Sequence, residues 1–314
     1  MLHVLNGDAT ATVFAGAGIA GERLVWRDIL VEGPVAIGDG TPESLAARAA
    51  WLGERLGIDR EAYARGVREQ ADGLTAAPEH DEVVLWFEQD LFCAVNLWSV
   101  LDWFARHARA TRLSLVYPEI AEVRGLGAMP AARLAAIFAE RRPVTEAMRA
   151  MGQLAWTTYA GADPLGSASL TTGEPPALPF VQGAFRCHLG RFPSVANGLN
   201  EVESAALTVL CRGPCAFGDL FREVTAHPHV RRHGMGDVQF AACVRGLAPL
   251  VDAIGGAVTS ADLEITRIGR DVVSASRDRL EIQPIDIWLG GVHLRGDRPR
   301  WRWDGARGRL VTAP

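Results

Sequence analysis

One continuous apolar run constrains the fold of this chain more than any other feature. Val83-Val84-Leu85-Trp86 has no polar interruption, which is the pattern expected of a strand buried on both faces of a parallel sheet. Phe87 follows, and then the polar stretch Glu88-Gln89-Asp90 ends the run. The sequence therefore predicts a central strand with acidic residues at its carboxyl end.

Two further predicted strands end in the same way. Residues 3–5 form a short apolar strand that stops at Asn6-Gly7-Asp8, and residues 22–26 form another that stops at Arg27-Asp28. Helical patterns, with apolar residues three or four positions apart, lie between and after these strands. They are predicted at residues 9–17, 44–56, 60–74, 91–106, 130–140 and 144–155, and one more strand is predicted at 113–117.

Strand–helix alternation favours a mainly parallel sheet with helices on both faces. We therefore predict an α/β fold class, with a Rossmann-like domain over residues 1–159 and a linker, rich in Gly, Ser, Thr and Pro, over residues 160–180. A mostly helical, winged-helix-like domain is predicted over residues 181–314. Its parts are helices at 200–210, 217–224 and 237–250, a wing hairpin near 258–266, a helix at 269–274 and a terminal β-hairpin at 287–303.

Composition excludes several classes of protein. Hydrophobic residues make up 48% and charged residues 22%, so most of the chain is expected to be ordered, and the net charge of −5 argues against a dedicated nucleic-acid or membrane-surface protein. No apolar run is long enough to cross a membrane, and the first residues do not resemble a signal peptide. The five cysteines form no Cys-x-x-Cys pair, which predicts buried free thiols and a cytoplasmic location.

Lysine is absent from the sequence, so every basic residue apart from histidine is an arginine. Schiff-base catalysis and a phosphate-binding loop of the Gly-Lys-Ser/Thr type are therefore excluded. Heavy use of Ala, Gly and Arg is typical of a GC-rich bacterial genome.

The strand-end acids are the candidate catalytic residues. If their strands are neighbours, Asp8, Asp28, Glu88 and Asp90 meet at one edge of the sheet, where ligands of open α/β sheets bind. They could act as general acid and base, and Asp8 and Asp90 could hold Mg²⁺ or Mn²⁺. The alternative is that each acid only caps the helix that follows it.

Neighbouring residues complete a predicted ligand site. Asn6 and Gly7 allow the backbone to approach an anion at the start of a helix, and Arg27 could clamp a carboxylate or phosphate. Trp26 and Trp86 precede the acids and are predicted to contact the ligand. The expected partner is a small anionic or nucleotide-like molecule.

Two other groups are weaker candidates. His227, His229 and His233 could bind a metal but fit an exposed loop between helices better. Trp301 and Trp303 alternate with arginines, a pattern that could stack on bases but more often packs a hairpin against its own domain.

Several stretches together carry a family resemblance. They are Asn6-Gly7-Asp8, Trp26-Arg27-Asp28, Glu32-Gly33-Pro34, Leu85-Trp86-Phe87-Glu88-Gln89-Asp90, Asn197-Gly198-Leu199 with Glu201 and Glu203, Trp288-Leu289-Gly290-Gly291 and Trp301-Arg302-Trp303-Asp304. In them the chain resembles the bacterial domain-of-unknown-function 1835 family with its associated C-terminal helical domain. The resemblance implies a two-part protein and brings no activity with it.

Three functions are compatible with these features. The first is an enzyme-like protein, a metal-dependent hydrolase or transferase, that acts on the anionic ligand. The second is a ligand-sensing regulator that binds nucleic acid through the winged-helix-like domain, although the predicted third helix carries only Arg245 as a basic residue. The third is a scaffold. The sequence favours the first and leaves the oligomeric state open.

Overall fold

A five-stranded sheet forms the centre of the first half of the protein in a computed structural model that describes residues 1–38, 40–117 and 125–312. The strand order is β2-β1-β3-β4-β5, and only β5 is antiparallel to its neighbour. An α/β fold with a mainly parallel sheet is therefore confirmed. The strands are β1 (Leu2–Asn6), β2 (Glu22–Trp26), β3 (Val83–Trp86), β4 (Leu113–Val116) and β5 (Arg142–Pro143).

The predicted central strand is β3, which has two strands on each side and four fully buried residues. Val83 and Leu85 pack into one core cluster, while Val84 and Trp86 pack into another on the opposite face. Helices therefore cover both faces of this strand, as expected for the centre of a parallel sheet.

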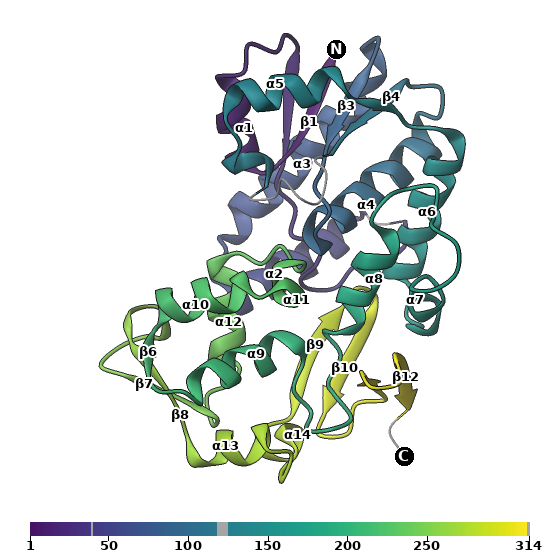
Figure 1. The fold of residues 1–314 in the computed structure, drawn as a ribbon. Helices are drawn as coiled ribbons and strands as arrows, with labels where there is room; N and C mark the ends of the chain where they lie inside the picture. The colour runs from purple at the N-terminus through teal and green to yellow at the C-terminus, as the bar shows by residue number, and fades with distance from the viewer. Residues whose placement is uncertain (39, 118–124, 313–314) are drawn as a thin grey trace.

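The helices of the first half divide between these two faces. Residues of α4, α6 and α8 belong to the larger core cluster, and residues of α1 and α5 belong to the other. In Figure 1, α1 and α5 lie together beside β1, while α4, α6 and α8 lie across the sheet. The helices are α1 (Asp8–Ala15), α2 (Pro42–Leu56), α3 (Arg60–Ala76), α4 (Leu91–His107), α5 (Ala131–Ala139), α6 (Glu146–Ala160), α7 (Leu165–Ser169) and α8 (Val181–Leu189), with short 3₁₀ turns η1 (Ala77–Glu79) and η3 (Leu126–Ala128).

The second half is a group of short helices with three small antiparallel sheets. Three strands pair in the order β6-β8-β7, and two separate hairpins follow. The elements are α9 (Glu201–Leu210), β6 (Cys215–Ala216), α10 (Phe217–Ala226), α11 (Pro228–Arg231), α12 (Asp237–Arg245), β7 (Val251–Ile254), η4 (Val258–Ser260), β8 (Asp262–Ile265), α13 (Arg267–Val273), α14 (Arg279–Ile282), β9 (Ile285–Leu289), β10 (Val292–Gly296), β11 (Trp301–Asp304) and β12 (Arg309–Thr312).

Some local predictions for this half are wrong. The third helix ends at Arg245, because Gly246 closes it and turns follow, so residues 246–250 are not helical. The predicted single hairpin at 287–303 is two hairpins, since β9 pairs with β10 and β11 pairs with β12. His233 is buried, in contrast to His227 and His229, which are exposed as expected.

The segment predicted as a linker contains secondary structure. It includes α7, and Leu178 near its end is fully buried in the core of the first half. Val181 and Phe185 on α8 belong to the same core cluster. The core of the first half therefore includes residues near the end of this segment and residues after it. The domain boundary stays a prediction.

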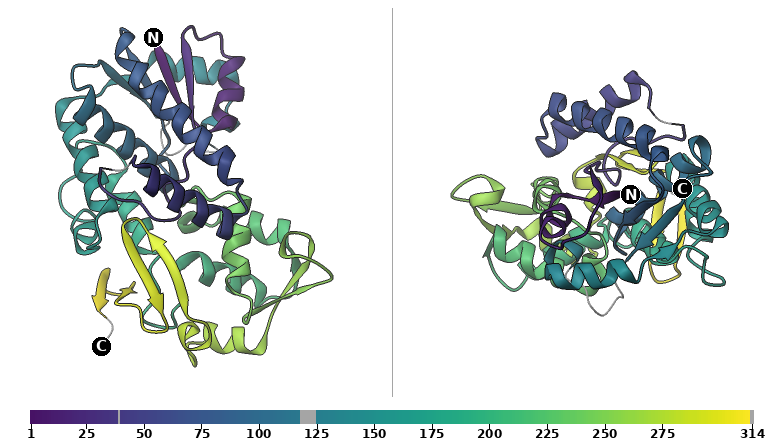
Figure 2. Two further views of the ribbon diagram at one scale, coloured as in Figure 1. Left: turned by 180° about the vertical axis from the view of Figure 1, so that it is seen from behind. Right: turned by 90° about the horizontal axis from the view of Figure 1, so that it is seen from above.

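The carboxyl ends of the parallel strands point toward the second half, as Figure 1 shows for β1 and β3. The Leu91 amide, at the start of α4, donates a hydrogen bond of 2.7 Å to the Arg232 carbonyl. Seen from behind in Figure 2, the β9–β10 hairpin and the helices of the second half lie side by side below α2. No helix within the described ranges has the length and apolar character needed to cross a membrane.

Candidate functional site

The three strands that end in acids are neighbours in the sheet. The order β2-β1-β3 places their carboxyl ends together, and the chain turns from one side of β1 to the other between β2 and β3. This change of direction makes the gap between the ends of β1 and β3 a topological switch point, where ligands of open α/β sheets bind.

Asp8 lies in the first turn of α1 and forms an ion pair with Arg27, which follows β2. Arg27 Nε and Nη2 both donate to the carboxylate, at 2.9 and 2.7 Å. The guanidinium holds the pKa of the Asp8 carboxyl below its usual range. More than half of each side chain is exposed, so the pair contributes less than about 1 kcal/mol to stability.

Asp28 has a different environment. Its Oδ1 accepts hydrogen bonds from Arg48 Nη2 at 3.1 Å and from the Tyr63 hydroxyl at 2.8 Å, and both partners come from helices that cover the sheet. The Asp28 and Arg48 side chains are only 10% and 6% exposed. This carboxylate therefore anchors α2 and α3 to the end of β2 and does not face the other acids.

Glu88 and Asp90 form the acidic pair of the site. Burial and, to a smaller extent, the nearby Asp90 carboxylate raise the pKa of Glu88 to about 7, against a weaker lowering by the hydrogen bond from the Leu126 amide. Leu126 N donates to Glu88 Oε1 at 2.7 Å. Burial also raises the pKa of Asp90, although its carboxylate accepts the amide hydrogen of Cys93 at 2.8 Å and so caps α4. Glu88 thus has the proton affinity of a general acid or base at neutral pH.

A network of side-chain amides connects β1 with α4. Asn6 Nδ2 donates to Cys93 Sγ at 2.9 Å, and Asn6 Oδ1 accepts from Asn96 Nδ2 at the same distance. Asn96 Nδ2 also donates to the Asp28 carbonyl at 3.1 Å, whereas Asn96 Oδ1 is buried without a hydrogen-bond partner in the described part of the chain. These hydrogen bonds connect the ends of β1 and β2 with α4, the helix that follows β3.

Two glycines lie near the ends of β1 and β3. Gly7 precedes α1 with a φ of +85°, and a Cβ atom there would meet nothing within 4 Å, so this side of the helix start is open. A Cβ atom at Gly125 would lie 2.8 Å from the Glu88 carboxylate. Only glycine lets the backbone before Leu126 approach Glu88 this closely.

The two predicted tryptophans lie in the core. Trp86 is fully buried, and its Nε1 donates to His3 Nδ1 at 3.1 Å. Trp26 is also buried, and its Nε1 has no hydrogen-bond partner among the described residues. Trp26 belongs to the core cluster on one face of the sheet and Trp86 to the cluster on the other face. Direct contact of either side chain with a ligand stays a prediction.

The second half covers one side of the site. A Cβ atom at Gly234 would lie 2.3 Å from Asp90 Oδ1, and Gly234 has a φ of +63°, so a side chain at this position would be excluded. Together with the bond between Leu91 and Arg232, this close approach places residues 232–234 over the start of α4.

The four acids are therefore not one cluster. Glu88 and Asp90 lie together, Asp8 is held on the surface by Arg27, and Asp28 is turned toward Arg48. No group of three His, Cys, Asp or Glu side chains that could hold a metal is present within residues 1–38, 40–117 and 125–312. These residues do not form a protein cage for a divalent cation, although Mg²⁺ often needs only one or two carboxylates beside a bound phosphate.

Sequence reasoning did not identify Cys93, Asn96 or the Leu126 amide. Asn96 had a recognisable feature, because it is a polar amide within the otherwise apolar stretch Cys93-Ala94-Val95-Asn96-Leu97-Trp98. A buried polar side chain of this kind needs a partner, which here is Asn6. The Leu126 amide could not be found, since backbone donors have no sequence pattern of their own.

A scan against protein-family models gives no match for this chain, and a search of curated proteins gives none either. The resemblance described above stays a prediction.

Proposed function

We propose that the protein binds a small anionic ligand at the switch point between the ends of β1 and β3, and that Glu88 transfers a proton in its hydrolysis or in a group transfer. The observation that carries the proposal is the position of Glu88, half-buried beside Asp90 at the switch point of the sheet. A carboxyl group that titrates near neutral pH can both donate and accept a proton under working conditions.

Arg27 supplies the positive charge in this proposal. Its present partner, Asp8, is an exposed surface carboxylate, so a ligand anion can take the place of Asp8 at small cost. Arginine suits the role because its planar guanidinium binds carboxylate and phosphate in a bidentate manner. The open backbone at Gly7 lets the anion approach the first turn of α1.

The test is a thermal-shift screen of nucleotides and sugar phosphates with the full chain. A ligand at a hundred times its dissociation constant stabilises the folded state by about 2.7 kcal/mol. We expect Arg27→Gln to weaken the binding of any hit at least tenfold, while the matched variant Arg23→Gln, exposed on β2, leaves it unchanged. Equal affinities of the two variants would contradict the role of Arg27.

Proton transfer by Glu88 is tested on the same hit. Glu88→Gln should keep the binding but lower turnover by a factor of about 10² to 10⁴, and Glu79→Gln, an exposed control, should not. Undiminished turnover in Glu88→Gln would show that the protein does not use Glu88 as a catalytic group.

The Mg²⁺ or Mn²⁺ proposal is tested by titrating each metal alone into wild type, Asp8→Asn and Asp90→Asn, since a protein-held metal requires those carboxylates.

The regulator hypothesis has less support. The order α9, β6, α10, α11, α12, β7, η4, β8, with the β6-β8-β7 sheet, supports a winged-helix-like interpretation of residues 201–265. The third helix of such a unit usually enters the DNA major groove, but α12 here packs against α2, and Arg245 Nη2 donates to the Arg55 carbonyl at 3.2 Å. We therefore propose a structural role for this unit, and salt-dependent DNA binding by the full chain would contradict it.

A further inference from the structure

A cavity lies where the two halves of the protein meet. Its volume is about 410 Å³, within the usual size range of small-molecule sites. The end of α2 forms one wall, the start of α9 and α12 form another, and β9 closes a third side. None of the strand-end acids lines it, so it is separate from the site at β1 and β3.

Arg279 is the most buried cation of this pocket. It is 6% exposed, and its Nη2 donates to the Gly246 carbonyl at 3.0 Å. The nearest carboxylate oxygen, Glu203 Oε1, is 3.4 Å away, and the other oxygen of Glu203 accepts the amide hydrogen of Asn200. Arg279 Nε is buried with no hydrogen-bond partner in the described ranges. A guanidinium has five donors, so this buried cation is incompletely satisfied.

A second arginine of the pocket is exposed to solvent. Arg55, near the end of α2, donates to the backbone carbonyl of Asp286 at 2.6 Å and forms no ion pair with the described residues. The Asp286 carboxylate is bound instead by His293 at 2.6 Å and lies 3.5 Å from Arg295. By contrast, the third arginine, Arg191, is paired with a carboxylate at 2.9 Å.

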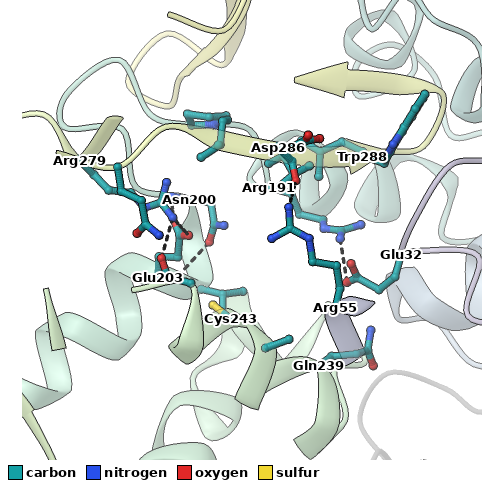
Figure 3. Close-up of a pocket in the computed structure, with 18 of the residues that line it drawn as sticks. Glu32, Arg55, Arg191, Asn200, Glu203, Gln239, Cys243, Arg279, Asp286 and Trp288 are labelled. Carbon is teal, nitrogen blue, oxygen red and sulfur yellow. Dashed lines mark hydrogen bonds and ion pairs between the residues drawn. The ribbon is translucent and has the colours of Figure 1, made fainter. Parts of the chain in front are cut away.

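The pocket lining carries three arginines and three carboxylates. Glu32 is paired with Arg191, and Asp286 lies against His293 and Arg295. Arg55 forms no ion pair with the described residues, and Arg279 keeps one donor without a partner there. In Figure 3, Arg279 and Glu203 lie on one side of the pocket, and Arg55 and Arg191 on the other.

Apolar side chains form the rest of the wall. Trp51 comes from α2, and Ile285 and Trp288 come from β9. The Trp288 ring is held in place by stacking on His293, with ring centroids 4.1 Å apart. A pocket with mainly apolar walls and a few placed cations is typical of sites for small organic anions.

We infer that this pocket binds a small organic carboxylate. Its carboxylate group accepts hydrogen bonds from the guanidinium groups of Arg55 and Arg279, and its apolar part packs against Trp51, Ile285 and Trp288. This site goes beyond the proposed function, because it shares no residue with the site at the ends of β1 and β3.

The experiment follows the indole N–H signals of the full, ¹⁵N-labelled chain by NMR during titration with benzoate, phenylacetate and hexanoate. Trp51→Phe and Trp288→Phe assign the two signals. We expect both signals to shift with a carboxylate and not with benzamide, the neutral analogue of benzoate. No shift with any of these carboxylates, or an equal shift with benzamide, would overturn the proposal, and a response to inorganic phosphate alone would overturn the assignment to carboxylates.

Two variants test the position of the ligand. Arg55→Gln should weaken binding of the responding carboxylate at least tenfold, whereas Arg65→Gln, an exposed arginine on α3, should leave it unchanged. Ala242→Phe, on the pocket wall, should block binding by filling the cavity. Arg27→Gln should have no effect, since Arg27 belongs to the other site. Affinities unchanged in both Arg55→Gln and Ala242→Phe would show that the carboxylate binds elsewhere.

Discussion

Acidic residues at neighbouring strand ends have different roles because their surroundings differ. Asp28 has an arginine, a tyrosine hydroxyl and a backbone amide around one oxygen, so its charge is compensated in place. Among the described residues, Glu88 accepts a hydrogen bond only from the Leu126 amide, and it lies beside another carboxylate. The same residue class therefore serves as a structural anchor at β2 and as a proton donor or acceptor at β3.

Glu88 should make the stability of the protein depend on pH. Its pKa of about 7 in the folded state lies above the value near 4.5 of an unfolded chain, so the folded state holds the extra proton between these values. Stability should fall as pH rises through this window, by about 3 kcal/mol in total, and then level off. We expect the free energy of unfolding in urea to fall between pH 5 and pH 8 for wild type relative to Glu88→Gln. Parallel pH profiles of the two proteins would contradict the raised pKa.

The elements of the fold were easier to predict than their environment. The strand 22–26 and the starts of the helices at Arg60, Leu91 and Phe217 agree with the structure. Asp59 and Asp90 cap the helices that start at Arg60 and Leu91, whereas the start at Phe217 has no side-chain cap. Asp90 shows where prediction from local sequence patterns ends. Its capping of α4 is a local property, whereas its proximity to Gly234 depends on the docking of the second half. No local pattern predicts that contact.

The β9–β10 turn provides a test at the scale of elements. The Gly291 amide donates to the Tyr159 carbonyl at 3.0 Å, and a Cβ atom at Gly291 would lie 2.0 Å from the Ala160 carbonyl oxygen. This close approach attaches the hairpin to the end of α6. Gly291→Ala should therefore cost about 1–3 kcal/mol, because a backbone must move to admit the methyl group.

The matched control for this change is Gly183→Ala in α8, where a Cβ atom would meet nothing within 4 Å. Alanine in a helix should there be neutral or stabilise by up to about 1 kcal/mol. Thermal unfolding followed by circular dichroism distinguishes the two variants, and equal melting temperatures would show that the turn can relax away from α6.

The whole molecule is held together by ion pairs and hydrogen bonds between its halves. Arg191, just after α8, pairs with Glu32 at 2.9 Å and donates to the Val31 carbonyl at 2.7 Å. The sequence predicted two parts but not their contact, since nothing in the stretch around Glu32 indicates a partner 159 positions away. The separate stretches that carry the family resemblance contribute Glu32, Glu203 and Trp288 to the pocket between the halves.

Arg191→Met should destabilise the whole protein by about 3 kcal/mol, because it leaves a largely buried carboxylate without its partner. The comparison is Arg212→Met, which breaks the exposed pair between Arg212 and Glu223 and should cost less than about 1 kcal/mol. Urea unfolding followed by tryptophan fluorescence measures both. A loss for Arg191→Met no greater than that for Arg212→Met would show that the pair between the halves adds little.

The contact between Arg55 and Asp286 has a consequence for protein synthesis. The two residues are 231 positions apart in the chain, yet they lie on facing walls of one pocket. During translation the wall formed by α2 leaves the ribosome long before β9 exists, so the pocket is absent from every nascent chain that ends before residue 286. A molecule that binds there can stabilise only chains that have been translated through β9, and truncated fragments gain nothing from its presence.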